Sequence, residues 1–183
     1  MDNRQLDQVF SNLEKKHEGS FAVEVVHLDS DARFQWRADR VLPTASTFKL
    51  CVLCELFRQA EAGDIDLNRP VTWPPEFHRG GDGVLRAMVP GQELSVHNMA
   101  VLMIMVSDNI ATETLLHLVG AENVTRTMQA WGLHDTDVHD GIPAGPDAAG
   151  QPQPESTAHD LCSLITQIYR RQRLTPASCD EII

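Results

Sequence analysis

Apolar residues recur every three or four positions along most of the chain, a spacing typical of helices that bury one face. Together with capping residues and glycines, this spacing predicts helices over residues 3–17, 46–61, 95–106, 110–119, 121–131, 157–172 and 176–183. The run Met99–Val106 is apolar on every side, so we expect the helix that contains it to be buried all round.

A different pattern near the start of the chain predicts a β-hairpin. Residues Phe21–Leu28 are rich in valine, Asp29–Asp31 has the composition of a turn, and a short second strand follows over Arg33–Arg37. A hairpin is not stable alone in water, so it requires further strands or cover by helices. The whole pattern therefore predicts an α+β fold that is mainly helical and carries an N-terminal antiparallel hairpin.

Two proline- and glycine-containing segments, residues 64–94 and 133–155, are predicted to be loops, and loops this long are often functional. The second contains His134–Asp140, whose side chains can bind metals. Their spacing matches no tight zinc pattern, however, and favours an acidic, solvated loop. Cys51 and Cys54 stand at a spacing used for metal or redox chemistry, but within a helical pattern, so we expect two buried apolar side chains. We predict no metal site and no cofactor.

The charge balance narrows the range of partners. Among its 183 residues the chain has 15 Lys and Arg against 26 Asp and Glu, a net charge of −11. An acidic surface repels phosphate backbones and anionic lipids, so neither nucleic acid nor membrane is an expected partner. No apolar run is long enough to cross a bilayer, and residues 1–5 lack the apolar core of an export signal. We therefore expect a cytoplasmic protein as the sequence is written, or a periplasmic or secreted one if it is a mature form.

Candidate chemistry begins at Ser46 and Lys49, which stand three residues apart at the start of a predicted helix. Residues at this spacing share one helical face, so the amine can reach the hydroxyl. An alcohol needs a neighbouring base, and a lysine among apolar residues can have a lowered pKa and serve as that base. The N–H groups of the helix N-terminus suit an anionic acyl intermediate. The spacing alone is common by chance, and a serine cap followed by a surface lysine is the alternative.

The tripeptide Ser107-Asp108-Asn109 is rarer, and it stands where the apolar helix is predicted to end. Its polar side chains would therefore be held beside the core. The alternative is a helix end followed by the N-cap of the next helix. The two motifs together are not expected by chance in a chain of this composition, so both enter the candidate site.

These two motifs resemble those of the class A β-lactamase and penicillin-binding serine hydrolase family. Further similar stretches extend the resemblance through nearly the whole chain, namely Thr44–Leu50, Gly80–Leu85, Met105–Thr112 and Ser156–Leu161. The resemblance implies a β-lactamase- or transpeptidase-like fold in which residues 1–183 form a single serine hydrolase domain. It also implies a small-molecule β-lactam or peptide substrate.

The resemblance assigns a role to each motif residue. Ser46 would attack the substrate carbonyl and become acylated, with its own backbone N–H as one oxyanion donor, and Lys49 would act as, or position, the base for this step. Ser107 would relay a proton to the departing nitrogen. Asn109 would bind the amide of the substrate and contact Lys49, while Asp108 would be structural.

The sequence departs from the family first in lacking a Lys-Thr-Gly motif, since its only lysines are Lys15, Lys16 and Lys49. In the family this motif lies on a later strand, which supplies a second oxyanion N–H. The chain therefore resembles the first two-thirds of a full domain, C-terminally incomplete, and we expect impaired catalysis. Its hairpin should either expose an edge or complete its sheet with a second chain.

The second departure lies in the loop over residues 133–155, which lacks the Glu-x-x-x-Asn that activates the deacylating water in class A enzymes. Counting without gaps places Ile142-Pro143 where the family has Glu-Pro. Nearby groups that could replace this base are Asp135, Asp137, His139 and Asp140. Without a base the acyl-enzyme should persist. The alternatives to a β-lactamase are thus a D-alanyl-D-alanine peptidase or esterase, and a non-catalytic penicillin-binding remnant.

Overall fold

The computed structural model describes residues 3–74, 77, 82–89, 91–141, 143 and 150–183. Its α-helices are α1 (Asn3–Lys16), α2 (Lys49–Ala62), α3 (Val96–Met105), α4 (Asn109–Val119), α5 (Ala121–Ala130), α6 (Ala158–Tyr169) and α7 (Pro176–Ile182). Its strands are β1 (Val23–Val26), β2 (Arg33–Trp36), β3 (Leu42–Pro43), β4 (Pro70–Val71), β5 (Leu94–Ser95) and β6 (Glu155–Ser156). Short 3₁₀ turns are η1 (Ala45–Phe48) and η3 (Leu85–Ala87).

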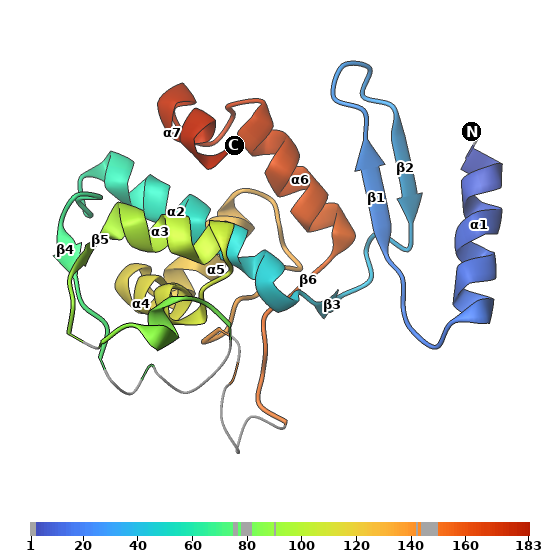
Figure 1. Cartoon of the computed structure of the whole chain (residues 1–183). Helices are drawn as coiled ribbons and strands as arrows, with labels where there is room; N and C mark the ends of the chain where they lie inside the picture. The colour runs from blue at the N-terminus through green and yellow to red at the C-terminus, as the bar shows by residue number, and fades with distance from the viewer. Residues whose placement is uncertain (1–2, 75–76, 78–81, 90, 142, 144–149) are drawn as a thin grey trace.

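The helical body is built around α2, which contacts α3, α4, α5 and α7 (Figure 1). Because α2 is surrounded by other helices, Cys51, Val52, Cys54 and Leu56 are all inaccessible to solvent. This confirms that the two cysteines are buried apolar side chains. Gly63 ends the helix in a left-handed conformation with φ of 81°, which costs glycine little.

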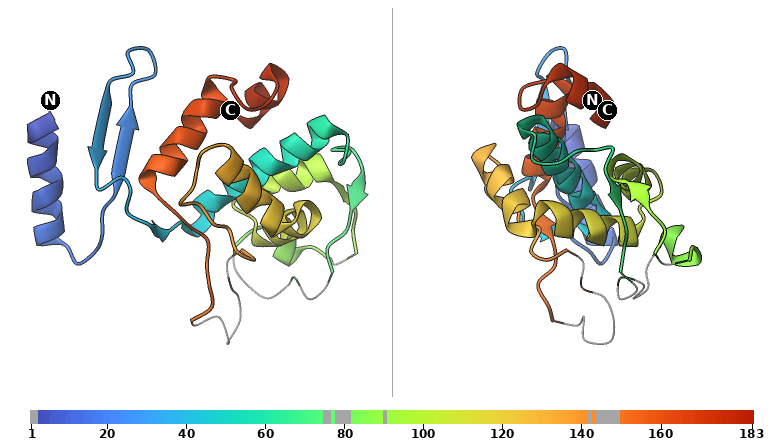
Figure 2. Two further views of the ribbon diagram at one scale, coloured as in Figure 1. Left: turned by 180° about the vertical axis from the view of Figure 1, so that it is seen from behind. Right: turned by 90° about the vertical axis from the view of Figure 1, so that its left-hand side faces the viewer.

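The predicted hairpin is confirmed, and it stands between two helices at the side of the helical body (Figures 1 and 2). On one face, Phe10 of α1 stacks on Phe34 and Trp36 of β2. On the other face, α6 packs against β1. Helix cover thus supplies the support that the hairpin needs.

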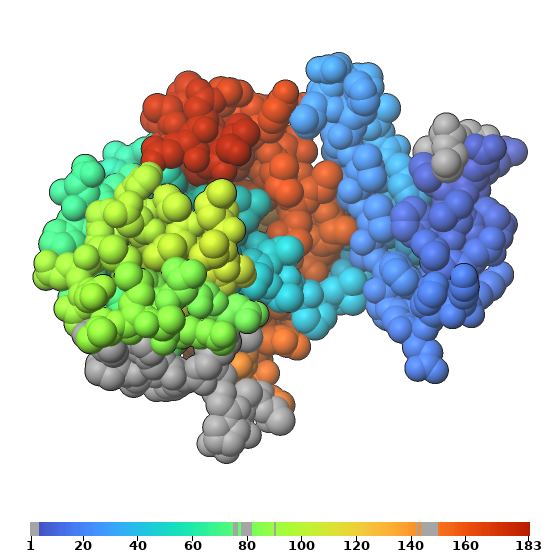
Figure 3. Space-filling model, viewed as in Figure 1, coloured from blue at the N-terminus to red at the C-terminus, as the bar shows by residue number. Residues whose placement is uncertain are grey.

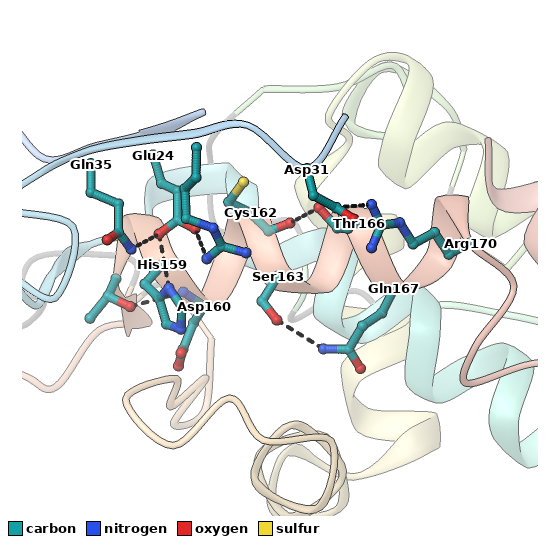
Figure 4. A network of polar contacts seen from close by, with 12 residues as sticks. Glu24, Asp31, Gln35, His159, Asp160, Cys162, Ser163, Thr166, Gln167 and Arg170 are labelled. Atoms are coloured by element: carbon teal, nitrogen blue, oxygen red, sulfur yellow. Dashed lines mark hydrogen bonds and ion pairs between the residues drawn. The ribbon is translucent and has the colours of Figure 1, made fainter. Parts of the chain in front are cut away.

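A buried carboxylate ties the hairpin to α6. The side chain of Glu24 is 1% exposed, and it accepts a hydrogen bond of 2.9 Å from Gln35 Nε2. Its Oε2 lies 2.8 Å from Nδ1 of His159, on the first turn of α6, and Arg33 pairs with its Oε1 (Figure 4). These contacts satisfy an otherwise costly buried charge and hold α6 across the face of the hairpin.

The described strands form three separate two-stranded antiparallel sheets, β1–β2, β3–β6 and β4–β5. The expected α+β architecture, mainly helical with an N-terminal hairpin, is confirmed. The helix predicted over 46–61 differs at its start, because η1 precedes α2 and Ser46 lies in the 3₁₀ turn.

The expectation that α3 is buried all round was wrong. Met99 and Met103 are fully buried, but Val101 and Ile104 are about two-fifths exposed and Met105 is 76% exposed. Helices α2 and α4 cover only one side of α3, so apolar side chains on its other side stay exposed to solvent. No helix within the described ranges is long and apolar enough to cross a membrane.

Candidate active site

Ser46 is held at the N-terminal end of the central helix by a pairing between distant segments. Strand β3 pairs with β6, so that Leu42 lies opposite Ser156. The backbone N–H of Thr44 donates to Pro154 O at 2.9 Å, and its hydroxyl donates to the same oxygen. Ala45 then adopts a φ of +45°, a strained value for a non-glycine residue, and the exposed Ser46 follows in the 3₁₀ turn. The end of the long loop therefore anchors the segment that presents the hydroxyl.

Lys49 connects the central helix to the junction between α3 and α4. Its side chain is buried, with 2% exposure, and its amine donates three hydrogen bonds. The acceptors are Ser107 O at 2.7 Å, Ser107 Oγ at 2.9 Å and Asn109 Oδ1 at 2.8 Å. Three acceptors satisfy the three N–H groups of an ammonium, which makes burial of the charged form tolerable.

Ser107 completes a continuous chain of hydrogen bonds. Its hydroxyl accepts from Lys49 and donates to Ser46 Oγ at 3.1 Å. Side chains from the two motifs therefore meet in one place, and Lys49 reaches Ser46 through Ser107 rather than directly. Ser107 also has a φ of +56°, so strained backbone occurs at both hydroxyl-bearing segments.

Asp108 positions this junction from within the core. Its carboxylate is fully buried and accepts the backbone N–H of Ala111 at 3.0 Å, as the N-cap of α4. The second oxygen accepts the N–H of Leu85 at 2.8 Å, which ties the junction to a separate loop. Asp108 therefore caps a helix, as one interpretation of the tripeptide predicts, while its neighbours Ser107 and Asn109 contact Lys49.

The segment over residues 82–85 supports the junction from the other side. The backbone N–H of Asn109 donates to Asp82 O at 3.0 Å. Gly83 lies so close that a Cβ atom there would stand 2.7 Å from Cα of Asp108 and closer still to its carboxylate. Only glycine permits this approach. Sequence reasoning placed this stretch within the resemblance but gave it no role, and its short Gly-Asp-Gly pattern was the available signal.

Burial and the nearby carboxylates shift the pKa of Lys49 in opposite directions. Burial lowers the pKa of Lys49 below its usual 10.5, and this is the largest effect. The carboxylates of Asp108 and Asp82 oppose it by stabilising the ammonium. Lys49 is therefore a stronger candidate for a base near neutral pH than a lysine in water.

Replacing Asp108 with alanine is expected to destabilise the fold by about 3–5 kcal/mol, because two buried N–H groups lose charge-assisted hydrogen bonds. Ser95→Ala is the matched control, since Ser95 caps α3 through one neutral hydrogen bond at an exposed site and should cost about 1 kcal/mol. Urea unfolding followed by circular dichroism measures both. Equal losses in the two variants would contradict the positioning role of Asp108.

The described part of the loop over residues 133–155 is anchored by neighbouring helices. Asp137 Oδ1 accepts from Thr125 Oγ1 at 3.2 Å and from the N–H of His139 at 2.8 Å. Asp160, 2% exposed, accepts from the N–H of Asp135 and from a threonine hydroxyl. The substitution of Ile142 for a deacylating base lies outside the described residues. The described residues include no group of three or more His, Cys, Asp or Glu side chains arranged to hold a metal ion.

Comparison with known proteins decides the family. The family model Beta-lactamase2, described as the beta-lactamase enzyme family, matches residues 4–183. The chain belongs to this family. The Ser46–Ser107–Lys49 arrangement is thus found in a member of a β-lactamase-type serine hydrolase family.

Two solved structures illustrate the likeness. An acyl-enzyme complex of a PBP-A mutant with penicillin G is 27% identical, with a TM-score of 0.85, and the match covers 98% of this chain and 68% of that one. A β-lactamase from Sphaerobacter thermophilus is 25% identical, with a TM-score of 0.88, and the match covers 100% of this chain and 68% of that one. This member of the family therefore spans about two-thirds of the length of both relatives.

Proposed function

We propose that residues 1–183 act as one β-lactamase-like unit whose Ser46 is acylated by a β-lactam or a related amide or ester. The observation that carries this proposal is the unbroken hydrogen-bond chain from Lys49 through Ser107 to Ser46. A buried amine with a lowered pKa at one end and an exposed hydroxyl at the other is the arrangement that nucleophilic catalysis by serine requires.

The acylation step uses the hydrogen-bond chain to move one proton, in net, from Ser46 to Lys49. With Lys49 neutral, Ser107 gives its proton to the amine while it takes the proton of Ser46. The freed Ser46 oxygen forms a bond to the carbonyl carbon, and the negative charge moves to the carbonyl oxygen. The backbone N–H of Ser46, at the start of η1 and α2, is one donor for that oxyanion.

Collapse of the intermediate breaks the carbon–nitrogen bond of the substrate. Ser107 donates a proton to the departing nitrogen and recovers one from Lys49, so the amine ends neutral and the acyl group stays on Ser46. Asn109 gives its side-chain oxygen to Lys49, which leaves its NH₂ group to bind the amide carbonyl of the substrate.

Release of the acyl group from Ser46 is the slow step in the proposed reaction. Asp137, one of the alternative bases, is already bonded to Thr125 and to the backbone of His139. We therefore propose slow deacylation and impaired turnover. The similarity to PBP-A, solved as an acyl-enzyme with penicillin G, favours a penicillin-binding peptidase or esterase as the second candidate.

The direct test is to incubate the folded protein with excess penicillin G and measure its intact mass. We expect a single adduct of one penicillin that maps to the peptide containing Ser46, together with slow turnover of a chromogenic cephalosporin. Fast turnover would contradict slow deacylation and indicate an efficient β-lactamase. A folded protein that forms no adduct would be a non-catalytic remnant, and the proposal would fail.

We also propose that a second polypeptide chain can complete the sheet that the hairpin begins. Strand β2 occupies one edge of β1, and no described strand occupies the other. Unpaired edges favour pairing between chains.

A further inference from the structure

The two ends of the long loop between α5 and α6 lie side by side at a neck, residues 135–137 and 154–156. The backbone N–H of Asp137 donates to Glu155 O at 3.0 Å, and the N–H of Glu155 donates to Asp137 O at 2.9 Å. Because both strands of the neck exchange backbone hydrogen bonds, the start of the loop is fixed against β6, at its end.

Asp160, in the first turn of α6, is a buried carboxylate that joins this helix to the neck (Figure 4). Its Oδ2 accepts hydrogen bonds from the N–H of Asp135 and from the hydroxyl of Thr136, both at 2.9 Å. Since Thr136 gives its one hydroxyl proton to Asp160, the buried Ser156 hydroxyl, 2.8 Å away, is the donor to Thr136. The carboxylate is thus linked to both sides of the neck, and the N-terminus of α6 favours its negative charge.

The neck also holds the segment that carries Ser46. Strand β6 pairs with β3, and Figure 3 shows the cyan segment that contains β3 and η1 beside the orange segment that leads into α6. Pro154 O accepts both the N–H and the hydroxyl of Thr44, two residues before Ser46. Between them, the strained backbone of Ala45 keeps its conformation only because its surroundings impose it. A shift of the neck would therefore move Ser46.

We propose that Asp160 is a positioning residue for the acylation of Ser46. Its carboxylate fixes the neck, the neck fixes Thr44, and Thr44 sets the direction in which the Ser46 hydroxyl points. The Oγ atoms of Ser46 and Ser107 are 3.1 Å apart, already long for a hydrogen bond between hydroxyls, so a further shift of about 1 Å would break the proton path. A misplacement of that size costs about 10²-fold in rate. This inference rests on the proposed function, but Asp160 acts through the neck rather than on the reacting atoms.

The test compares Asp160→Asn, which keeps the shape and an acceptor oxygen but loses the charge, with Asp160→Ala, which loses both. Intact mass measured against time at several penicillin G concentrations separates the dissociation constant of the first complex from the acylation rate constant at saturation. We expect that rate constant to fall about tenfold in Asp160→Asn and about 10²-fold in Asp160→Ala. The dissociation constant should change little, because no group that contacts substrate is altered. The N–H of Thr44 should exchange with solvent faster in both variants.

Glu55→Gln is the matched control for the loss of a buried carboxylate. Glu55 is fully buried farther along α2, where it is bonded to Arg58 and not to the neck. This variant should lose stability and still acylate at the parent rate at saturation. Thr136→Val serves if the Asp160 variants do not fold, because it removes one hydroxyl from the same link at nearly constant volume, and it should show the same pattern as Asp160→Asn.

A folded Asp160→Asn that acylates at the parent rate would overturn the positioning role, as would an equal fall in Glu55→Gln. A weaker first complex with an unchanged rate constant would also overturn it, since the effect would then be on substrate binding. A parent protein that forms no adduct would contradict the proposed function instead. Exchange at Thr44 then decides alone: faster exchange in Asp160→Asn supports the link from Asp160 to Thr44, and unchanged exchange overturns it.

Discussion

Replacing Ser46 with alanine is expected to abolish the covalent penicillin adduct and leave the fold unchanged. The Ser46 side chain is exposed, and its hydroxyl is bonded to Ser107 Oγ, so its loss should alter stability by about 0.5 kcal/mol or less. Intact mass after incubation with penicillin G measures the adduct, and circular dichroism verifies the fold. The effect on acylation should be complete, because Ser46 is the one hydroxyl among the described residues that ends the hydrogen-bond chain from Lys49 through Ser107.

Thr47→Ala provides the matched control for this loss. Thr47 is the neighbouring exposed hydroxyl, and it donates to Thr44 O at 2.7 Å rather than to the hydrogen-bond chain. This variant should form the adduct at a rate close to that of the parent protein. An adduct that persists in Ser46→Ala would place the nucleophile elsewhere and contradict the proposed mechanism.

Replacing Lys49 with methionine should slow acylation by about 10²–10⁴-fold, the range associated with removal of a general base. Methionine fills the space of the buried stem but leaves Ser107 and Asn109 without their donor, so some loss of stability is also expected. Lys49→Arg separates the two effects. Arginine keeps a donor and a charge but cannot be deprotonated, so it should preserve more stability than methionine and still acylate slowly. Rapid acylation in Lys49→Arg would exclude a base role.

The pH dependence of acylation gives an independent measure of the same residue. Acylation should accelerate as pH rises through the pKa of Lys49, because only the neutral amine accepts a proton. Burial lowers that pKa, so the rise should lie below pH 10.5. Asp82→Asn removes a charge that raises the pKa and should move the rise to lower pH. If the rise in acylation rate had the same midpoint pH in the parent protein and in Asp82→Asn, Asp82 would not affect the pKa of Lys49.

Local patterns along the chain determined much of the secondary structure and the chemistry. Helical spacing ending at glycine predicted α2 and α4 closely, since Gly63 and Gly120 stop them. Ser95 was identifiable as an N-cap because serine before an apolar run satisfies an orphan N–H. Ser46, Lys49, Ser107 and Asn109 were identifiable because each motif is contiguous in sequence.

Tertiary packing decided the features that join residues far apart in sequence and those that depend on neighbouring segments. The apolar face of α3 stayed exposed because its burial depends on which segments lie beside it, not on its own composition. The pairing of β3 with β6 involves two residues on each side, too short for a recognisable strand pattern. Ser107 came between Lys49 and Ser46 because a left-handed turn, held by the buried Asp108, aims its hydroxyl there. Sequence therefore indicated which groups belong to one site, and the fold decided that the Ser107 hydroxyl lies between Lys49 and Ser46.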